Sequence, residues 1–226
     1  MIKHHPKYEL IQSFVNGDLP ASLSAAISIH ADMCPTCKQH ITLLTDQVAE
    51  LSFDDLPSNI EDEYLVNDYI LNMDFDKMIE GITQSNEVDV KKSVEIKTVN
   101  FKNKPYKLPV ALNNINLGKT AQIGKLARSR LQLNENEIHT NLLHIEPGGS
   151  VPEHTHKGFE LTLLLEGSFH DDKGEYVKGD FIMLDGNHTH NPISDSGCLC
   201  YTVANDALHF TQGINKLLNP IGSFIY

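Results

Sequence analysis

Three potential metal ligands lie close together near the N-terminus, where residues 30–37 read HADMCPTC. His30 and Cys34 are four residues apart, about one helical turn on one face, and Cys37 follows three residues later. Imidazole and thiolate groups are ligands that Zn²⁺ prefers, and three of them in so short a segment can close around one tetrahedral ion. The H-x3-C-x2-C cluster therefore predicts a zinc-stapled helical module.

A second set of metal-ligating residue types lies in the C-terminal half, in the pattern G-x5-H-x-H-x3-E-x6-G. Its members His154, His156 and Glu160 share parity, so on one regular strand their side chains would point to one face. A later strand ends near His188 and His190, and an imidazole from it can join them. Such a set suits Zn²⁺, Mn²⁺, Fe²⁺ or Ni²⁺, so we predict a second metal site inside a small barrel.

The elements that must position the first cluster are helices. Gly17 is placed to end a first helix, a stripe of apolar residues at helical spacing runs up to His30, and Pro35 opens a third helix. A longer apolar pattern from Ile60 to Ile82 predicts a fourth helix. Its wide apolar surface suits either packing in the core of the small domain or a face offered to a partner.

The second cluster lies among predicted strands. Residues 83–93, TQSNEVDVKKS, are polar and lack periodicity, and beyond them short runs such as ELTLLLEG and CLCYTVA alternate with turn residues, as in an all-β sandwich or barrel. We therefore predict an α+β chain of two domains, with a helical zinc-binding domain at 1–85, a linker at 86–95 and a β domain at 96–226.

The charge of the chain is concentrated in its first part. Residues 1–90 contain 16 acidic and 4 basic residues, a balance of −12, whereas residues 91–226 contain 14 of each. Phosphates require positive charge, so direct nucleic-acid binding through the acidic part is not expected. A basic protein partner is the natural complement of this surface, and a merely solvated acidic face is the alternative.

The cysteines and the hydropathy indicate a cytoplasmic protein. The sequence has no apolar run long enough to cross a membrane, and its polar opening is unlike a signal peptide. Four cysteines in two close pairs are a poor disulfide framework. Cys34 and Cys37 fit a metal site. Cys198 and Cys200 alternate along an apolar run, which favours a buried strand pair over a redox site.

Taken together, the two halves resemble a known family. The C-terminal pattern resembles the two-part cupin signature, whose spacing from Gly179 puts the last ligand at His190, although Asp185 and Asn187 replace the usual proline and glycine. A short helical module with H-x3-C-x2-C, preceded by a histidine near residue 5, resembles the zinc-binding anti-sigma domain. Joined to a cupin, it resembles the ChrR-type anti-sigma factors of proteobacteria, over nearly the whole chain.

The resemblance implies a jelly-roll cupin barrel and two sets of metal ligands. The implied sets are His5, His30, Cys34 and Cys37 for zinc, and His154, His156, Glu160 and His190 for zinc or another divalent metal. His5 lies 25 residues before His30, so it reaches the site only if the first helix folds back. Metal binding would then contribute directly to folding. His4 and His40 are competing ligands.

The resemblance also implies a function. The family's N-terminal domain binds an extracytoplasmic-function (group IV, sigma-E-like) sigma factor and hides its polymerase-binding surfaces, and the cupin domain releases it under singlet oxygen or related oxidative stress. We therefore expect a one-to-one complex with a sigma factor, with Cys198 and Cys200 as conceivable oxidant targets and no catalysis. The alternative is a metal-dependent cupin enzyme, a dioxygenase or isomerase, with a helical zinc appendage.

Overall fold

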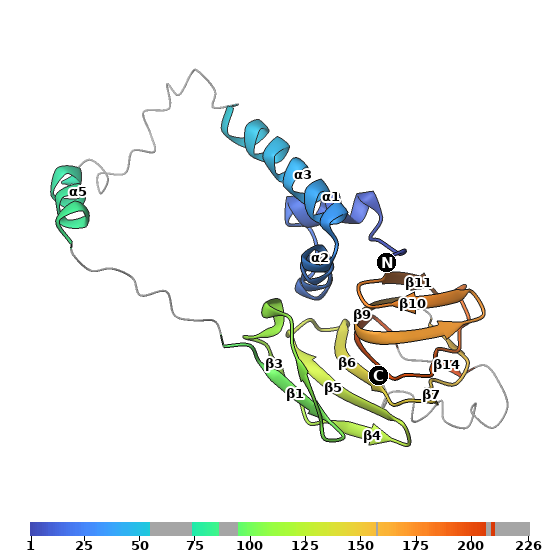
Figure 1. Ribbon diagram of the computed structural model, residues 1–226. Helices are drawn as coiled ribbons and strands as arrows, with labels where there is room; N and C mark the ends of the chain where they lie inside the picture. Colours follow the sequence, from blue (N-terminus) through green and yellow to red (C-terminus); the bar gives the residue numbers. More distant parts are fainter. Residues whose placement is uncertain (55–73, 86–94, 157, 207–208, 211–226) are drawn as a thin grey trace. The chain divides into compact units, whose positions relative to one another are not determined.

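The N-terminal part of the chain is helical, as its apolar spacing predicts. The computed structural model describes residues 1–54, 74–85, 95–156, 158–206 and 209–210. Within these ranges the α-helices are α1 (Tyr8–Asn16), α2 (Ala21–Met33), α3 (Pro35–Asp54) and α5 (Phe75–Gln84) (Figure 1).

Local chemistry explains where the first helices end and begin. Gly17 takes a left-handed conformation (φ 78°) after α1, and its N–H donates to the carbonyl of Phe14, as the sequence predicts for a helix end. Pro35 opens α3, because its fixed φ suits a first helical turn and its missing N–H would have had no partner there. Cys34 has extended backbone between α2 and α3, so the chain changes direction at the cysteine cluster.

The fourth predicted helix is interrupted at Asp74. The prediction ran continuously from Ile60 to Ile82, and its portion at 60–73 lies outside the described residues. Helix α5 begins only at Phe75, because Asp74 has non-helical backbone and its carboxylate accepts a hydrogen bond from the N–H of Lys77 at 3.1 Å. Because Asp74 is the N-cap of α5 and is not itself helical, the prediction of one continuous helix from Ile60 to Ile82 was wrong.

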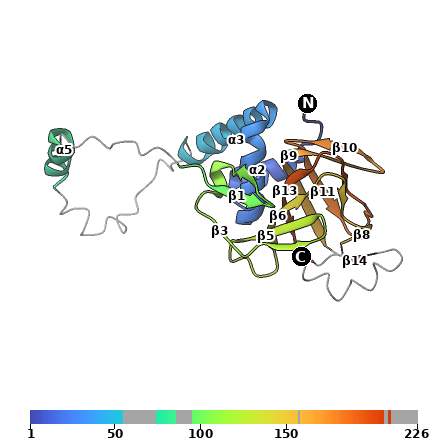
Figure 2. The same ribbon diagram turned by 60° about the horizontal axis from the view of Figure 1, so that its bottom comes forward.

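The remainder of the described chain is antiparallel sheet, which confirms the predicted α+β fold class. Its strands are β1 (Thr98–Phe101), β2 (Lys104–Lys107), β3 (Asn116–Leu117), β4 (Ala121–Ile123), β5 (Leu126–Gln132), β6 (His139–Ile145), β7 (Gly149–Ser150), β8 (His154–Thr155), β9 (Phe159–Asp171), β10 (Gly174–Val177), β11 (Phe181–Asp185), β12 (Ile193–Ser194), β13 (Cys198–Ala204) and β14 (His209–Phe210), with a short 3₁₀ helix, η1 (Val110–Leu112). The main sheet has the order β3-β5-β6-β13-β9-β12-β7, while β10 and β11 also pair with β9, and β4 pairs with β5. The sheet curls into a barrel (Figure 2).

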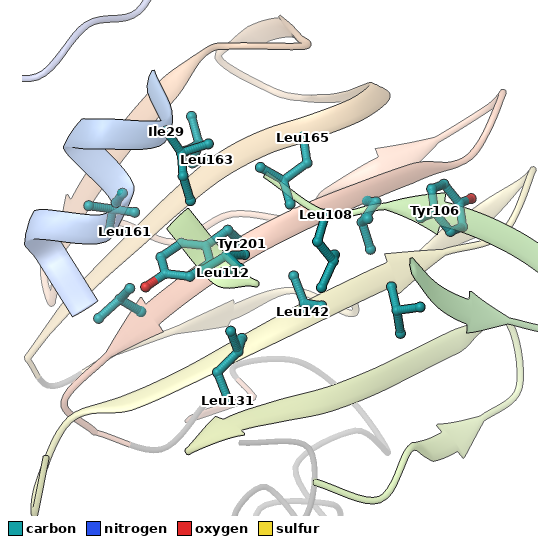
Figure 3. Packing of buried hydrophobic residues seen from close by; sticks show 14 of the residues in the cluster. Ile29, Tyr106, Leu108, Leu112, Leu131, Leu142, Leu161, Leu163, Leu165 and Tyr201 are labelled. Carbon is teal, nitrogen blue, oxygen red and sulfur yellow. The ribbon is translucent and has the colours of Figure 1, made fainter. Parts of the chain in front are cut away.

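Alternation along the central strands gives the sheet two different faces. Leu161 and Leu163 of β9 and Tyr201 of β13 face outward and are fully buried, whereas Glu160 and Thr162 of β9 line the interior of the barrel. Ile29 of α2 packs with these outward residues (Figure 3). The hydroxyl of Tyr201 also donates to the carbonyl of Ser22 in α2, at 2.9 Å. Helix α2 and the sheet therefore share one core.

The compact units of the structure do not follow the predicted domain boundaries. One unit combines Met1–Val48 with Ile96–Tyr226, and the other contains Ala49–Glu95. The predicted linker at 86–95 falls almost wholly outside the described residues, so the predicted boundaries remain predictions.

Candidate metal centres

The four residues of the N-terminal set lie together where α2 meets α3. The Nδ1 atom of His5 is 3.4 Å from the Sγ atom of Cys34 and 3.5 Å from that of Cys37, and Nε2 of His30 is 3.3 Å from Sγ of Cys37. Ligand atoms on a tetrahedral zinc ion lie roughly 3.4–3.6 Å apart, given Zn–N bonds of about 2.0–2.1 Å and Zn–S bonds of about 2.3 Å. The donor types and their spacing therefore fit tetrahedral zinc.

The hydrogen bonding of His30 prepares its ring for a metal. His30 is fully buried, and its Nδ1 donates to the carbonyl of Gly179 at 2.8 Å, so the lone pair of Nε2 points toward the thiols. Burial lowers the pKa of His30, while the bond to Gly179 raises it less, so the ring is neutral at pH 7. A neutral imidazole with a fixed tautomer is the form that ligates a metal.

The thiols are held in an apolar setting. Cys34 and Cys37 are both buried, with Ile11 in the same small cluster. Burial, followed by the hydrogen bond with Cys34, raises the pKa of Cys37 to about 12. Because metal binding needs the thiolate, a metal here must displace a proton.

The competing histidines lie away from these thiols. The ring of His4 packs against Tyr176, with ring centroids 4.9 Å apart, and His40 is exposed on α3. The first helix does fold back and bring His5 to the site, which is what the fourth-ligand hypothesis requires.

The C-terminal set also converges, but not from one regular strand as parity suggested. His154 belongs to β8, His156 lies in the connection that follows, and Glu160 lies near the start of β9. His190 stands opposite His154 in an isolated antiparallel bridge. The ligand atoms of all four lie within 4.8 Å of one another, inside the barrel. The predicted residues therefore meet, although the single strand was wrong.

The distances within the barrel set are shorter than those of the N-terminal set. Nε2 of His190 lies 2.8 Å from Nε2 of His154 and 3.1 Å from Oε2 of Glu160, and Nε2 of His156 lies 2.9 Å from the same oxygen. Ligands at right angles on a metal with bonds of about 2.1 Å lie roughly 3.0 Å apart. The spacing thus lies in the range that ligands of one divalent ion have, and the four groups are close enough together to hold it.

Hydrogen bonds and burial set the charge states of the barrel ligands. The Nδ1 of His154 donates to the carbonyl of Pro152 at 2.8 Å, which leaves Nε2 with its lone pair toward the other ligands. Burial is the main cause that lowers the pKa of His154 to about 4. Burial alone would raise the pKa of Glu160. The hydrogen bonds of its carboxylate with His156 and His190 nevertheless hold this pKa well below that of an ordinary glutamate. One carboxylate among imidazoles suits a divalent cation.

A cavity of about 60 Å³ adjoins the barrel set. Arg128, Asn141 and Cys200 line it together with apolar side chains, and Nη1 of Arg128 lies 3.5 Å from Oδ1 of Asn141. A water molecule needs roughly 10–15 Å³ of cavity volume, so the cavity holds about four to six waters or one small molecule.

The second cysteine pair is buried on the barrel side of β13. Cys198 and Cys200 are free thiols whose Sγ atoms lie 3.9 Å apart. The hydrogen bond between the two thiols is the main cause of the shift in each pKa. It lowers the pKa of Cys198 and raises the pKa of Cys200 well above the ordinary value. The sequence correctly predicted a buried strand pair, and a redox role for it remains a prediction.

Sequence reasoning missed the residues that support the N-terminal set from the barrel. Gly179 accepts the hydrogen bond of His30 across 149 positions of sequence, and the buried Asp180 accepts from the backbone of Lys3 and His4. The Gly-Asp pair was visible as the start of a strand, but nothing local connects it to the first residues of the chain.

Among the described helices, none has the length and apolar character needed to cross a membrane.

Comparisons with known proteins agree with both halves of this arrangement. Residues 116–207 match the family described as the ChrR cupin-like domain. The chain is also 23% identical, over 221 residues, to the anti-sigma-E factor ChrR of Cereibacter sphaeroides, with 97% of each sequence covered. The similarity therefore extends through the helical part as well as the barrel, and it confirms the resemblance to ChrR-type proteins.

One solved structure with a TM-score above 0.5 confirms the fold. ChrR in the crystal structure of Rhodobacter sphaeroides SigE in complex with the anti-sigma ChrR has a TM-score of 0.62 and 21% identity, covering 90% of this chain and 99% of that chain. An RmlC-like cupin protein from Ralstonia eutropha JMP134 has a TM-score of 0.38 and 15% identity, covering 44% of this chain and 69% of that chain.

Proposed function

We propose that this protein is an anti-sigma factor, since residues 116–207 match the family described as the ChrR cupin-like domain and the similarity to ChrR runs through both halves of the chain. It binds an extracytoplasmic-function sigma factor as a one-to-one heterodimer and so prevents transcription from that factor's promoters. The whole-length similarity to ChrR is the observation that carries the proposal. Because RNA polymerase works in the cytoplasm, the protein acts there.

Exposed apolar side chains in the acidic part of the chain support a protein partner. On α5, Phe75, Met78, Ile79 and Ile82 follow the i, i+3, i+4, i+7 pattern of one helix face, and each is 47–67% exposed. An apolar helix face of this kind is suited to a groove on another protein.

Charge supplies the second part of the recognition. Residues 1–90 have a net charge of −12, while the rest of the chain is neutral. This charge complements a basic surface, steers association at low salt, and is screened beyond roughly 8–10 Å at physiological ionic strength. Inhibition is thus stoichiometric occlusion of the partner and needs no chemical step.

The test is co-expression with the extracytoplasmic-function sigma factor encoded beside the gene, followed by co-purification and transcription from the cognate promoter. We expect a complex that silences the promoter. Met78→Asp and Ile82→Asp together should weaken binding about 10–100-fold or more, since apolar anchors at interfaces contribute about 1.4 kcal/mol or more each. Ile123→Asp changes an exposed isoleucine of β4 and serves as the matched control. A wild-type protein that neither binds nor represses the factor would rule out the proposal.

We propose that the N-terminal set holds structural zinc and that the barrel set holds a second divalent ion. Thiolate–imidazole chemistry and spacings of 3.3–3.5 Å support the first, and three imidazoles with a carboxylate at 2.8–3.1 Å support the second. The zinc would tie the N-terminus, α2 and α3 together. The barrel ion would order residues from β8, β9 and the segment before β12.

We further propose that the barrel senses the releasing signal, which is singlet oxygen or related oxidative stress. Its buried ligand set, its cavity and the thiols of Cys198 and Cys200 form the chemically reactive part of the barrel. Glu160→Gln should leave sigma binding intact in unstressed cells and blunt the stress response of a reporter gene. Glu166→Gln, a surface change on the same strand, should respond normally. Loss of sigma binding in unstressed Glu160→Gln cells would contradict this division of labour.

A metal-dependent enzyme is the second candidate function, because the barrel ligands adjoin a cavity that can hold a small molecule. The genomic neighbourhood distinguishes the two candidate functions. A sigma-factor gene beside the gene of this protein supports the regulator, and a catabolic operon supports the enzyme.

A further inference from the structure

The turn formed by Gly179 and Asp180, just before β11, contacts the N-terminal metal set from the barrel side. The carbonyl of Gly179 accepts the hydrogen bond from Nδ1 of His30 at 2.8 Å. This bond fixes the tautomer and the orientation of the imidazole. A residue of the barrel therefore decides how a ligand of the helical site points.

The carboxylate of Asp180 holds the backbone on the other side of the same site. Its Oδ1 accepts from the N–H groups of Lys3 and His4 at 2.7 and 3.0 Å, and its Oδ2 accepts from the N–H of Val177 at 2.8 Å. Asp180 is fully buried, so these three bonds replace the water that the carboxylate loses. Two of them fix the residues directly before His5.

Backbone pairing and close packing complete the attachment. The N–H of Phe181 donates to the carbonyl of His4 at 3.0 Å, so one further backbone hydrogen bond attaches the N-terminal segment to the first residue of β11. Gly179 has a φ of 92°, and a Cβ atom there would lie 2.5 Å from the side chain of Ile2. Only glycine allows both this backbone conformation and the close approach of the N-terminal segment.

We propose that Asp180 is a positioning residue for the N-terminal metal site and that the barrel thereby sets the metal affinity of the helical site. Asp180 places His5 by holding Lys3 and His4, while Gly179 orients His30. Groups that orient metal-ligating histidines typically change metal affinity 10–100-fold when removed. This inference rests on the proposed metal role of the four ligands and adds a contribution from outside the helices.

The same turn is attached to the strand that carries a barrel ligand. The N–H of Gly179 donates to the carbonyl of Leu164 at 2.9 Å. In return, the N–H of Leu164 donates to the carbonyl of Asp180 at 3.2 Å. Leu164 lies on β9, four residues after Glu160. A change in the barrel that shifts β9 therefore reaches the N-terminal site through two backbone hydrogen bonds, which gives the proposed sensor a physical route to the sigma-binding part.

The experiment measures metal affinity at the N-terminal site alone in the full-length chain. Cobalt(II) bound to thiolates gives a near-ultraviolet charge-transfer band, and the barrel set contains no thiolate ligand, so the band reports Cys34 and Cys37. Competition with a chelator of known affinity then gives the dissociation constant. Asp180→Ala should weaken cobalt binding about 10–100-fold, and Asp172→Ala, an exposed aspartate close in sequence, should leave it unchanged.

Lys3→Pro guards against a folding defect of the Asp180 variant. It removes the N–H that donates to Asp180 and leaves every residue of the barrel as it is, so binding should weaken in the same direction. Affinities within about twofold of wild type in both variants would overturn the inference. A wild-type chain without the thiolate band would overturn the metal site and the inference together. Neither measurement involves a sigma factor, so the result is separate from the test of the proposed function.

Discussion

At the scale of single residues, the two cysteine pairs have the same chemistry and different surroundings. Cys34 and Cys37 face two imidazoles at 3.3–3.5 Å, whereas Cys198 and Cys200 face each other at 3.9 Å along one strand. All four are buried. The neighbouring imidazoles, and not burial or the short C-x-C or C-x-x-C spacing, single out one pair as candidate metal ligands.

This difference predicts opposite results for one substitution. Cys37→Ser should remove one equivalent of metal from purified protein and lower the stability of the N-terminal helices, because a structural zinc contributes directly to folding. Cys200→Ser should keep the full metal content. Elemental analysis of proteins purified without chelator gives the metal-to-protein ratio, with two equivalents expected for wild type. Equal metal content in the two variants would contradict the assignment.

At the scale of elements, α2 matters for the barrel as much as for the metal site. Its residues Leu23, Ala26, Ile27 and Ile29 share a core cluster with residues of β9 and β13. Helix α5, by contrast, has no buried side chain among its described residues. Helix α2 therefore stabilises the fold, whereas α5 offers an apolar face.

An identical substitution in the two helices separates these roles. Ile29→Ala should lower the free energy of unfolding by about 2–5 kcal/mol, because it leaves a cavity between α2 and the sheet. Ile82→Ala, at a side chain that is 67% exposed, should change it by no more than about 0.5 kcal/mol. Urea unfolding followed by circular dichroism measures both. A large loss of stability for Ile82→Ala would show that α5 is covered within the monomer.

At the scale of the whole molecule, the first two helices and the barrel belong to one compact unit. Residues 1–48 belong to the same compact unit as the barrel, through the α2 core, the bond from Tyr201 to Ser22 and the contacts of Asp180. If the barrel is the sensor proposed above, the core that it shares with α2 lets a change in the barrel act on that helix without a signal passing through the linker.

A cut in the linker tests this packing. A protease site placed at residues 88–93 and cleaved in the purified protein should leave two fragments that elute together, because their shared core does not depend on the linker. In denaturant the same sample should separate, which verifies that cleavage is complete. Fragments that separate under native conditions would show that the helices and the barrel are independent domains.

Features that depend on near neighbours in the chain could be predicted from the sequence. The ligand types, the one-turn spacing of His30 and Cys34, the helix end at Gly17 and the alternation of Cys198 and Cys200 are local, and the structure has them as predicted. The resemblance to ChrR-type proteins could be read from the same local motifs. Local pattern failed at Asp74, where a cap competes with apolar periodicity, and between β8 and β9, where the chain leaves the strand between two ligands.

The tertiary structure alone decided which distant groups meet. It brought His5 to the thiols, placed α2 on the outer face of the sheet, and set the carbonyl of Gly179 against His30, 149 residues away. Such pairs follow from how buried surfaces pack and from the need of buried polar groups for partners, which no helical or strand period encodes. For that reason the contacts of Gly179 and Asp180 with the N-terminal candidate site emerged only from the folded chain.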